Sequence, residues 1–407
     1  MKYIHNISGK IEHLDYEINI DLNGKNLILV GANGVGKTSI LDSIYKSINI
    51  ELEKNNSQID SFKNTLDYYK RDIKNYTEGS NEYIDKLNSI KYYKEKLKEF
   101  NSPLTLSIPN ISDFIRNFNT KKAIRSNFSA YRISRIQATS SSTSLEEEKK
   151  NSLELEYVGS TLEQHLLNIR VTKSLLMTEA KDHVKANKFS QWFDNFERQL
   201  KYLFEDNDTK LEFDVSSMKF YIIQKNKKFT FQNLSSGYQA IFDIYADLLM
   251  RTELFDITPD ELTGVVLIDE IDAHLHISLQ KIILPFFINS FPKVQFIVST
   301  HSPFVISSSS NTVIYDLTTQ ELITNNVTYY SNDAIVKGLF HVNTTHSIEL
   351  QDIIDELKEV IDSDINESNK LREYIKKLEP FKERLTNSAK VILLLAENKV
   401  LDIEENR

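Results

Sequence analysis

The chain has 407 residues, of which 40% are hydrophobic, so it can form two or three average domains or one core that carries insertions. It has no cysteine, which excludes disulfides, thiol nucleophiles and thiolate metal sites; it also has no run of about 18 apolar residues and no secretory signal at its start, so we expect a cytoplasmic protein without a membrane span. With 49 basic and 58 acidic residues the net charge is −9, so the net charge does not attract nucleic acid. DNA could bind only through local clusters of basic residues.

The first predicted element is a strand, loop and helix unit. Residues 27–31 form a short apolar run that ends in glycine, and the spacing Gly31-x4-Gly36-Lys37-Thr38 that follows fits a P-loop. In such a loop the backbone N–H groups wrap nucleotide phosphates, Lys37 reaches the β- and γ-phosphates, and the Thr38 hydroxyl ligates Mg²⁺. Glycines are needed because side chains would block the approach of the backbone to phosphate. The predicted phosphate-binding residues are Gly31, Asn33, Gly34, Gly36, Lys37, Thr38 and Ser39.

A helical insertion is predicted next. Apolar and aromatic residues from Leu52 to Tyr76 fall mostly three and four apart, as in a coiled coil, and a second such pattern follows the break at Glu78 to Asn81. Residues 51–100 are therefore predicted to form a short antiparallel helical hairpin with arms of roughly 30–40 Å, at 1.5 Å per residue.

A serine and glycine loop precedes another predicted helix. Ser235, Ser236 and Gly237 stand just before a helical run, where hydroxyls and free N–H groups at the positive end of the helix dipole favour an anion. The same three residues are equally compatible, taken alone, with an ordinary helix cap.

Two predicted strands end in polar residues. Residues 265–268 form a buried-strand run that ends in Asp269 and Glu270, at the carboxyl end where α/β folds bind ligands. There Asp269 would hold Mg²⁺ through water and Glu270 would polarise an attacking water; the alternative is two surface acids. Residues 294–298 form a second strand that runs toward His301, which is placed to contact a γ-phosphate unless it is a structural histidine.

The rest of the chain is predicted to be mostly helical. A strand at 313–317 is followed by two apolar stripes, from Leu350 to Ile361 and from Leu371 to Leu385, which indicate a docking surface or simple packing. The predicted organisation is a discontinuous head (residues 1–50 and 101–345), the hairpin (51–100) and a C-terminal helical docking region (346–407).

These motifs in this order resemble the ABC ATPase superfamily and, in detail, its SMC/RecF/OLD branch. The segments GANGVGKTS, LSSGYQ, VVLIDE continuing as IDAHLH, and STHSP carry the resemblance and span residues 27–303. It implies an α/β head with a mixed sheet, which uses ATP and Mg²⁺ and holds the nucleotide between two protomers. Ser235 and Gly237, with Ser236 between them, are then implied to contact the γ-phosphate that the other protomer binds.

The resemblance also implies roles for three loops. Ala273, His274, Leu275 and His276 would communicate between the two nucleotide sites, and Gln137 is the candidate for a glutamine that senses Mg²⁺, unless it is a plain loop residue. Two residues depart from the usual signature, Ser236 where glycine is common and Tyr238 where an acid or glutamine is common. Contacts to the opposite protomer are therefore expected to be weaker or differently shaped.

The reaction that we predict is attack of water on the γ-phosphate of ATP. Lys37 stabilises charge, Glu270 is the base and His301 senses the γ-phosphate. A nuclease of the OLD type needs a strand-borne glutamate and a later Asp-x-Asp; Asp362 and Asp364 have that spacing, but without such a strand, so we expect no nuclease in this chain.

Stand-alone ATPases of this kind resemble the ATPase subunits of bacterial anti-phage systems such as Septu and PARIS. That resemblance implies a dimer or higher oligomer that senses infection and controls a separately encoded nuclease. The alternative is a RecF-like repair ATPase that binds DNA in an ATP-dependent way.

Overall fold

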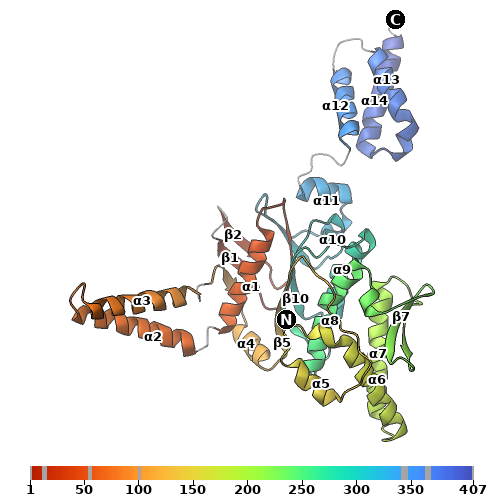
Figure 1. Cartoon of the computed structure of the whole chain (residues 1–407). Coiled ribbons are helices and arrows are strands. Elements are labelled where there is room, and N and C mark those ends of the chain that lie inside the picture. Colours follow the sequence, from red (N-terminus) through yellow and green to blue (C-terminus); the bar gives the residue numbers. More distant parts are fainter. Residues whose placement is uncertain are drawn as a thin grey trace. The chain divides into compact units, whose positions relative to one another are not determined.

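A computed structural model describes residues 2–11, 16–53, 57–99, 102–340, 347–362 and 368–405 (Figure 1). By its contacts the chain divides into two compact units, Met1–Ile335 and Val336–Arg407. Asp364, which belongs to the Asp-x-Asp pair, lies outside the described residues.

The first unit is built on a mixed six-stranded sheet. Its order is β12-β11-β3-β10-β9-β5, with every neighbouring pair parallel except β11 and β12. The strands are β12 (Glu321–Ile323), β11 (Thr312–Asp316), β3 (Asn26–Val30), β10 (Val294–Ser299), β9 (Thr263–Ile268) and β5 (Ala123–Phe128). The predicted α/β class with a mixed sheet is therefore confirmed.

The central strands are buried on both faces. Every residue of β3, β10 and β11 is buried, as expected for parallel strands that are covered on each side, and such strands are recognisable in sequence as continuous apolar runs. The strands predicted at 27–31, 265–268, 294–298 and 313–317 are β3, β9, β10 and β11.

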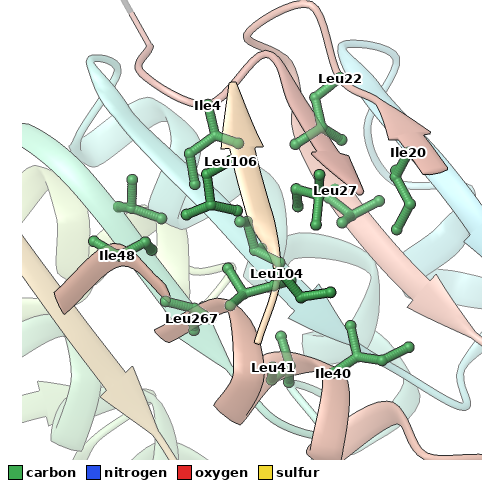
Figure 2. Close-up of a cluster of buried hydrophobic side chains, with 14 of the residues drawn as sticks. Ile4, Ile20, Leu22, Leu27, Ile40, Leu41, Ile48, Leu104, Leu106 and Leu267 are labelled. Carbon is green, nitrogen blue, oxygen red and sulfur yellow. The ribbon is translucent and has the colours of Figure 1, made fainter. Parts of the chain in front are cut away.

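One face of this sheet packs against a smaller antiparallel sheet and helix α1 (Lys37–Glu53). The small sheet has the order β2-β1-β4, with β2 at Glu17–Asp21, β1 at Asn6–Lys10 and β4 at Thr105–Ser107. Figure 2 shows Leu27 and Leu267 of the large sheet in one buried cluster with Leu106 of the small sheet and Ile40 of α1. Because β3 and α1 both pack in this core, it holds the two ends of the glycine loop that joins them.

The other face is rich in aromatic side chains from α8 (Ser236–Phe255) and α9 (Ile277–Ser290). Phe287 of α9 stacks on Phe296 of β10 with ring centres 5.9 Å apart, and Phe286 contacts Tyr245 of α8 at 5.0 Å. The serine and glycine segment at the start of α8 is thereby anchored to the same sheet as the glycine loop.

Further helices and a third sheet complete the first unit. The third sheet has the order β6-β7-β8, and α6 and α7 pack against each other and contact its strands. The remaining bounds are β6 (Lys210–Asp214), β7 (Lys219–Gln224), β8 (Lys227–Phe229), α4 (Ile111–Asn119), α5 (Leu145–Ser152), α6 (Leu162–Thr178), α7 (His183–Leu203) and α10 (Pro303–Ile306), with short 3₁₀ turns at Val158–Thr161, Phe231–Asn233 and Val327–Tyr329. The boundary between the two units falls within α11 (Asn332–Leu339).

The inserted hairpin consists of α2 (Ser57–Asp72) and α3 (Asn81–Glu99), joined by a 3₁₀ turn at Ile73–Asn75. The two helices lie side by side, in orange in Figure 1. Tyr69 and Tyr93 stack between them at 5.7 Å, and Lys86 bonds Asp72 across the pair.

The second unit contains α12 (Ile348–Asp362), α13 (Ser368–Leu378) and α14 (Asn387–Glu405), with a 3₁₀ turn at Glu379–Arg384. Ile353 and Leu357 of the first apolar stripe pack with Leu371 and Leu378 of the second in one core. A role of this region in docking stays a prediction. Among the described residues of both units, no helix is long and apolar enough to cross a membrane.

Candidate nucleotide-binding site

The glycine loop joins β3 to α1 with three glycines in left-handed or related conformations. The φ angles of Gly31, Gly34 and Gly36 are +144°, +77° and +100°, which side-chain-bearing residues rarely adopt. A Cβ on Gly31 would also lie 2.9 Å from the Val35 side chain. The loop therefore requires glycine for its shape, and its remaining predicted residue Asn33 is exposed.

Lys37 begins α1 and is buried beside the loop. Its Nζ donates to the carbonyl oxygens of Gly31 at 3.0 Å and Ala32 at 2.9 Å. Burial lowers the pKa of Lys37, while the charges of Glu270 and Asp269 act in the opposite direction. An ammonium group held at the mouth of a P-loop suits the binding of phosphate.

The structure brings the loop and the acidic strand end together. Thr38 Oγ1 donates to Asp269 Oδ2 at 2.7 Å, although 231 positions separate the two residues in sequence. The contact forms because only β10 lies between β3 and β9, so that their carboxyl ends meet at one edge of the sheet. A hydroxyl and a carboxylate are the oxygen donors that Mg²⁺ prefers, so these two residues fit a magnesium ion bound with the nucleotide.

Glu270 follows in a strained conformation that Ser299 supports. Its φ is +44°, in the left-handed region. Its N–H donates to Ser299 Oγ at 2.7 Å, and the Ser299 hydroxyl donates to Asp269 Oδ1. Sequence analysis missed Ser299, for which the only available signal was a hydroxyl residue at the end of an apolar strand.

His301 lies just beyond the end of β10, next to the same acids. Asp272 accepts from the His301 N–H at 3.3 Å and from the Thr300 hydroxyl, which fixes the backbone of this turn. Burial and then the positive charge of Lys37 lower the pKa of His301. A lowered pKa favours the neutral imidazole, which can donate one N–H while accepting at its other nitrogen.

The predicted signature lies at the amino end of α8. Ser235 caps this helix with its backbone and makes no side-chain cap hydrogen bond, and both Ser235 and Ser236 are exposed. Gly237 is buried against the turn after β9, where an added Cβ would lie 3.1 Å from the His274 carbonyl oxygen. The two hydroxyls thus face outward at a helix start, as contact with a nucleotide on another protomer requires.

The loop from Ala273 to His276 lies against this glycine. His274 has a φ of +64°, Leu275 is buried, and the His276 ring accepts from the Ser278 N–H at the start of α9. The Tyr238 departure has a packing reason, since its ring stacks on Phe204 with centres 4.3 Å apart. Tyr238 is therefore half-buried and packs against Phe204.

The two remaining predicted residues occupy different settings. Ser39 is half-buried in the first turn of α1, beside Thr38. Gln137 is exposed, and its N–H donates to the Ser160 carbonyl at 3.0 Å. Its role with Mg²⁺ stays a prediction. The residue of its loop that contacts the acidic turn is Arg132, which sequence analysis missed.

A glycine phosphate loop at the end of a central parallel strand, with a threonine bonded to the acid of a neighbouring strand, defines the class of P-loop nucleotide-binding proteins. The family model described as "AAA domain, putative AbiEii toxin, Type IV TA system" matches residues 27–307. The chain belongs to this family.

Several known proteins are similar to this chain. Septu protein PtuA of Bacillus mycoides (strain KBAB4) is 26% identical over 296 residues, which are 71% of this chain and 36% of that protein. The Retron Ec83 probable ATPase of Escherichia coli is 36% identical over 105 residues, which are 25% of this chain and 19% of that protein. The matches thus span about a third or less of these relatives. Among solved structures, the SMC head domain from Thermotoga maritima aligns over 77% of this chain and 94% of its own, with a TM-score of 0.35 and 12% identity.

Proposed function

We propose that this protein binds ATP between two copies of itself and hydrolyses it to ADP and phosphate. The observation that carries the proposal is the hydrogen bond between Thr38 and Asp269, which joins the phosphate loop to the acidic turn. ATP hydrolysis needs a phosphate cradle, a metal position and a carboxylate base in one place, and the chain supplies them in the loop after β3, at the start of α1 and in the turn after β9.

The proposed roles follow from position and charge. Lys37 neutralises charge on the β- and γ-phosphates, and Thr38 with Asp269 would hold Mg²⁺, which neutralises phosphate charge when it is bound. Glu270 accepts the proton of the attacking water, since its carboxylate lies on the turn next to the metal position. Neutral His301 donates a hydrogen bond to the γ-phosphate without adding a proton to the cluster.

The second copy is inferred from the exposed serines of α8, which would contact the γ-phosphate of a nucleotide held by another protomer. Ser235 and Ser236 stand at the start of a helix of 20 residues, where backbone N–H groups and the helix dipole attract phosphate. The proposed contact with a second copy is supported by the exposure of both serines and by the burial of Gly237, which lets the start of α8 pack closely against the turn after β9.

The substitution Glu270→Gln tests this proposal. It removes the base while keeping the size of the side chain, so we expect ATP turnover to fall by about a hundredfold or more and ATP-bound dimers to accumulate. Turnover is measured by phosphate release, and dimers by light scattering with and without ATP. Glu321→Gln, at an exposed acid on β12, is the matched control and should hydrolyse ATP like the parent. Parental turnover in Glu270→Gln would refute the assignment of the base.

We further propose that the ATPase is the sensor or regulatory subunit of an anti-phage defence complex and controls a separate nuclease. The support is the likeness to Septu protein PtuA over 71% of this chain and to retron ATPases over shorter segments. Net charge of −9 also favours a protein partner over DNA.

The test is purification of the tagged protein from its own locus, followed by mass analysis of what accompanies it. A stoichiometric nuclease whose activity changes with ATP supports the defence role. A homodimer that binds DNA only with ATP, and whose turnover rises with DNA ends, would replace it with the RecF-like repair function.

A further inference from the structure

We propose that Arg132 is a positioning residue for ATP hydrolysis, which fixes the backbone of the turn that carries Glu270. The proposal rests on the proposed function, because it assumes that Glu270 is the base. Arg132 lies in the loop after β5, a segment to which sequence analysis assigned only Gln137.

The guanidinium of Arg132 links two parts of the chain through their carbonyl oxygens. Its Nη1 donates to Asp269 O at 2.6 Å and to Ser129 O at 2.6 Å, and its Nη2 donates to Glu270 O at 2.8 Å. The residue is 6% exposed, so these bonds are shielded from water. One side chain thus ties the carbonyls of both acidic residues to the end of β5.

This contact matters because the turn is strained. Glu270 has a φ of +44°, a conformation that costs a side-chain-bearing residue energy and persists only when its surroundings enforce it. On one side the Glu270 N–H is held by Ser299; on the other, the Glu270 carbonyl accepts from both Arg132 and the Ala273 N–H. The φ and ψ angles set the direction of the Cα–Cβ bond, so the same contacts aim the Glu270 carboxylate.

The geometry is particular to arginine. Three carbonyl oxygens accept from the two Nη atoms of one planar group, whereas a lysine ammonium is a single point charge on a flexible stem. Arg135, three residues further on, has a different environment: its side chain is 61% exposed and its Nε donates to Asp243 of α8 at 3.3 Å. It is therefore a matched control within the same loop.

The experiment is a double-mutant cycle between Arg132 and Glu270, measured by single-turnover ATP hydrolysis and by ATP binding. We expect Arg132→Ala to lower the hydrolysis rate by about tenfold or more in the parent, with ATP affinity changed less than about threefold. In the Glu270→Gln background the same change should cost less than about twofold, because the aimed carboxylate is already absent. Arg132→Lys should recover part of the parental rate.

The control variant Arg135→Ala distinguishes a positioning role of Arg132 from a general loss of protein stability. Arg135→Ala should change the rate by the same factor in both backgrounds, since it does not touch the turn. An equal factor for Arg132→Ala in both backgrounds, or a parental rate in Arg132→Ala, would overturn the proposal. If Arg132→Ala does not fold, Arg132→Lys is carried through the same cycle and decides by the same criterion.

Hydrogen exchange tests the geometry independently of turnover. Amide protection of the turn from Glu270 to Leu275 should fall in Arg132→Ala, stay parental in Arg135→Ala, and remain unchanged in β3 of both variants. Unchanged protection of the turn in Arg132→Ala would overturn the proposal even in a protein that hydrolyses no ATP. A parent without turnover, but with the predicted loss of protection, would refute only the proposed function.

Discussion

Replacing Ser299 with alanine removes one buried hydroxyl from the centre of the acidic turn. Ser299 is fully buried at the end of β10, where its Oγ accepts from the Glu270 N–H and donates to Asp269 Oδ1. Alanine fits the space without strain, but both partners lose a hydrogen bond in a place that water reaches poorly. The substitution therefore isolates the polar contribution of one oxygen atom.

The expected cost follows from the two partners that are left behind. A buried polar group that loses its only partner costs about 1–3 kcal/mol, and more when it is charged. The Asp269 carboxylate keeps its bond from Thr38, and Glu270 is only partly buried, so each loss falls below the upper limit. We expect Ser299→Ala to lower the free energy of unfolding of the first unit by about 2–4 kcal/mol, and ATP turnover to fall because both acids lose orientation.

The assay is urea unfolding followed by the fluorescence of Trp192. This is the single tryptophan of the chain, and it lies on α7 of the first unit, where its indole N–H bonds Glu253 at 2.7 Å. Its signal therefore reports on the unit that contains Ser299.

Ser126→Ala is the matched control for this experiment. Ser126 is a buried serine of β5 in the same sheet, but its Oγ has no hydrogen-bond partner within the described part of the chain. We expect its replacement to change the free energy of unfolding by less than about 0.5 kcal/mol. Equal effects of the two substitutions would refute the reasoning that the Ser299 hydroxyl stabilises the turn.

Three further predictions use the same assay. Gly264→Ala should destabilise the first unit by more than about 4 kcal/mol, since its φ is +127° and a Cβ would lie 2.1 Å from a backbone oxygen of β5. Burial raises the pKa of Glu163, so its neutral form stabilises the folded protein at low pH, and this contribution is lost as pH rises and the carboxyl ionises. Glu163→Gln should therefore be more stable than the parent at pH 7 and equal to it near pH 4. Burial lowers the pKa of His165, but the hydrogen bond to Glu148 and nearby carboxylates outweigh burial and raise it. Its contribution is therefore present below about pH 6.5 and lost above, and the stability difference between the parent and His165→Leu should shrink as pH rises. A difference that is constant with pH would contradict each of the last two.

The parts of the fold that can be predicted from the sequence are the buried parallel strands and the residues that follow them. The strands β3 and β10 are buried on both faces and contain the apolar runs 27–30 and 296–298, and polar residues after such runs stand at the carboxyl edge of the sheet. Asp269, Glu270 and His301 are predicted in this way, Lys37 is predicted from the P-loop spacing, and the structure brings all four to one edge.

The parts that sequence misses depend on contacts with backbone atoms. Arg132 and Arg135 lie three residues apart in one polar loop, and no local pattern shows that the first is buried while the second is 61% exposed at its side chain. Ser299 is likewise defined by the Glu270 N–H that it meets. Such partners follow from the left-handed turn at Glu270, which has no sequence signature of its own.

The same contacts connect the metal position to the proposed base. Asp269 accepts from Thr38 through one oxygen and from Ser299 through the other, and Ser299 in turn accepts from the Glu270 N–H. Thr38 and Asp269 would hold a Mg²⁺ ion bound with the nucleotide, which would neutralise phosphate charge, and the other Asp269 oxygen would still accept from Ser299. Because Arg132 holds the Glu270 carbonyl from the opposite side, a shift of Asp269 cannot be absorbed by free movement of the turn. We therefore expect a shift of Asp269 to change the direction of the Glu270 carboxylate, so that nucleotide occupancy and the proposed base would be coupled within one protomer.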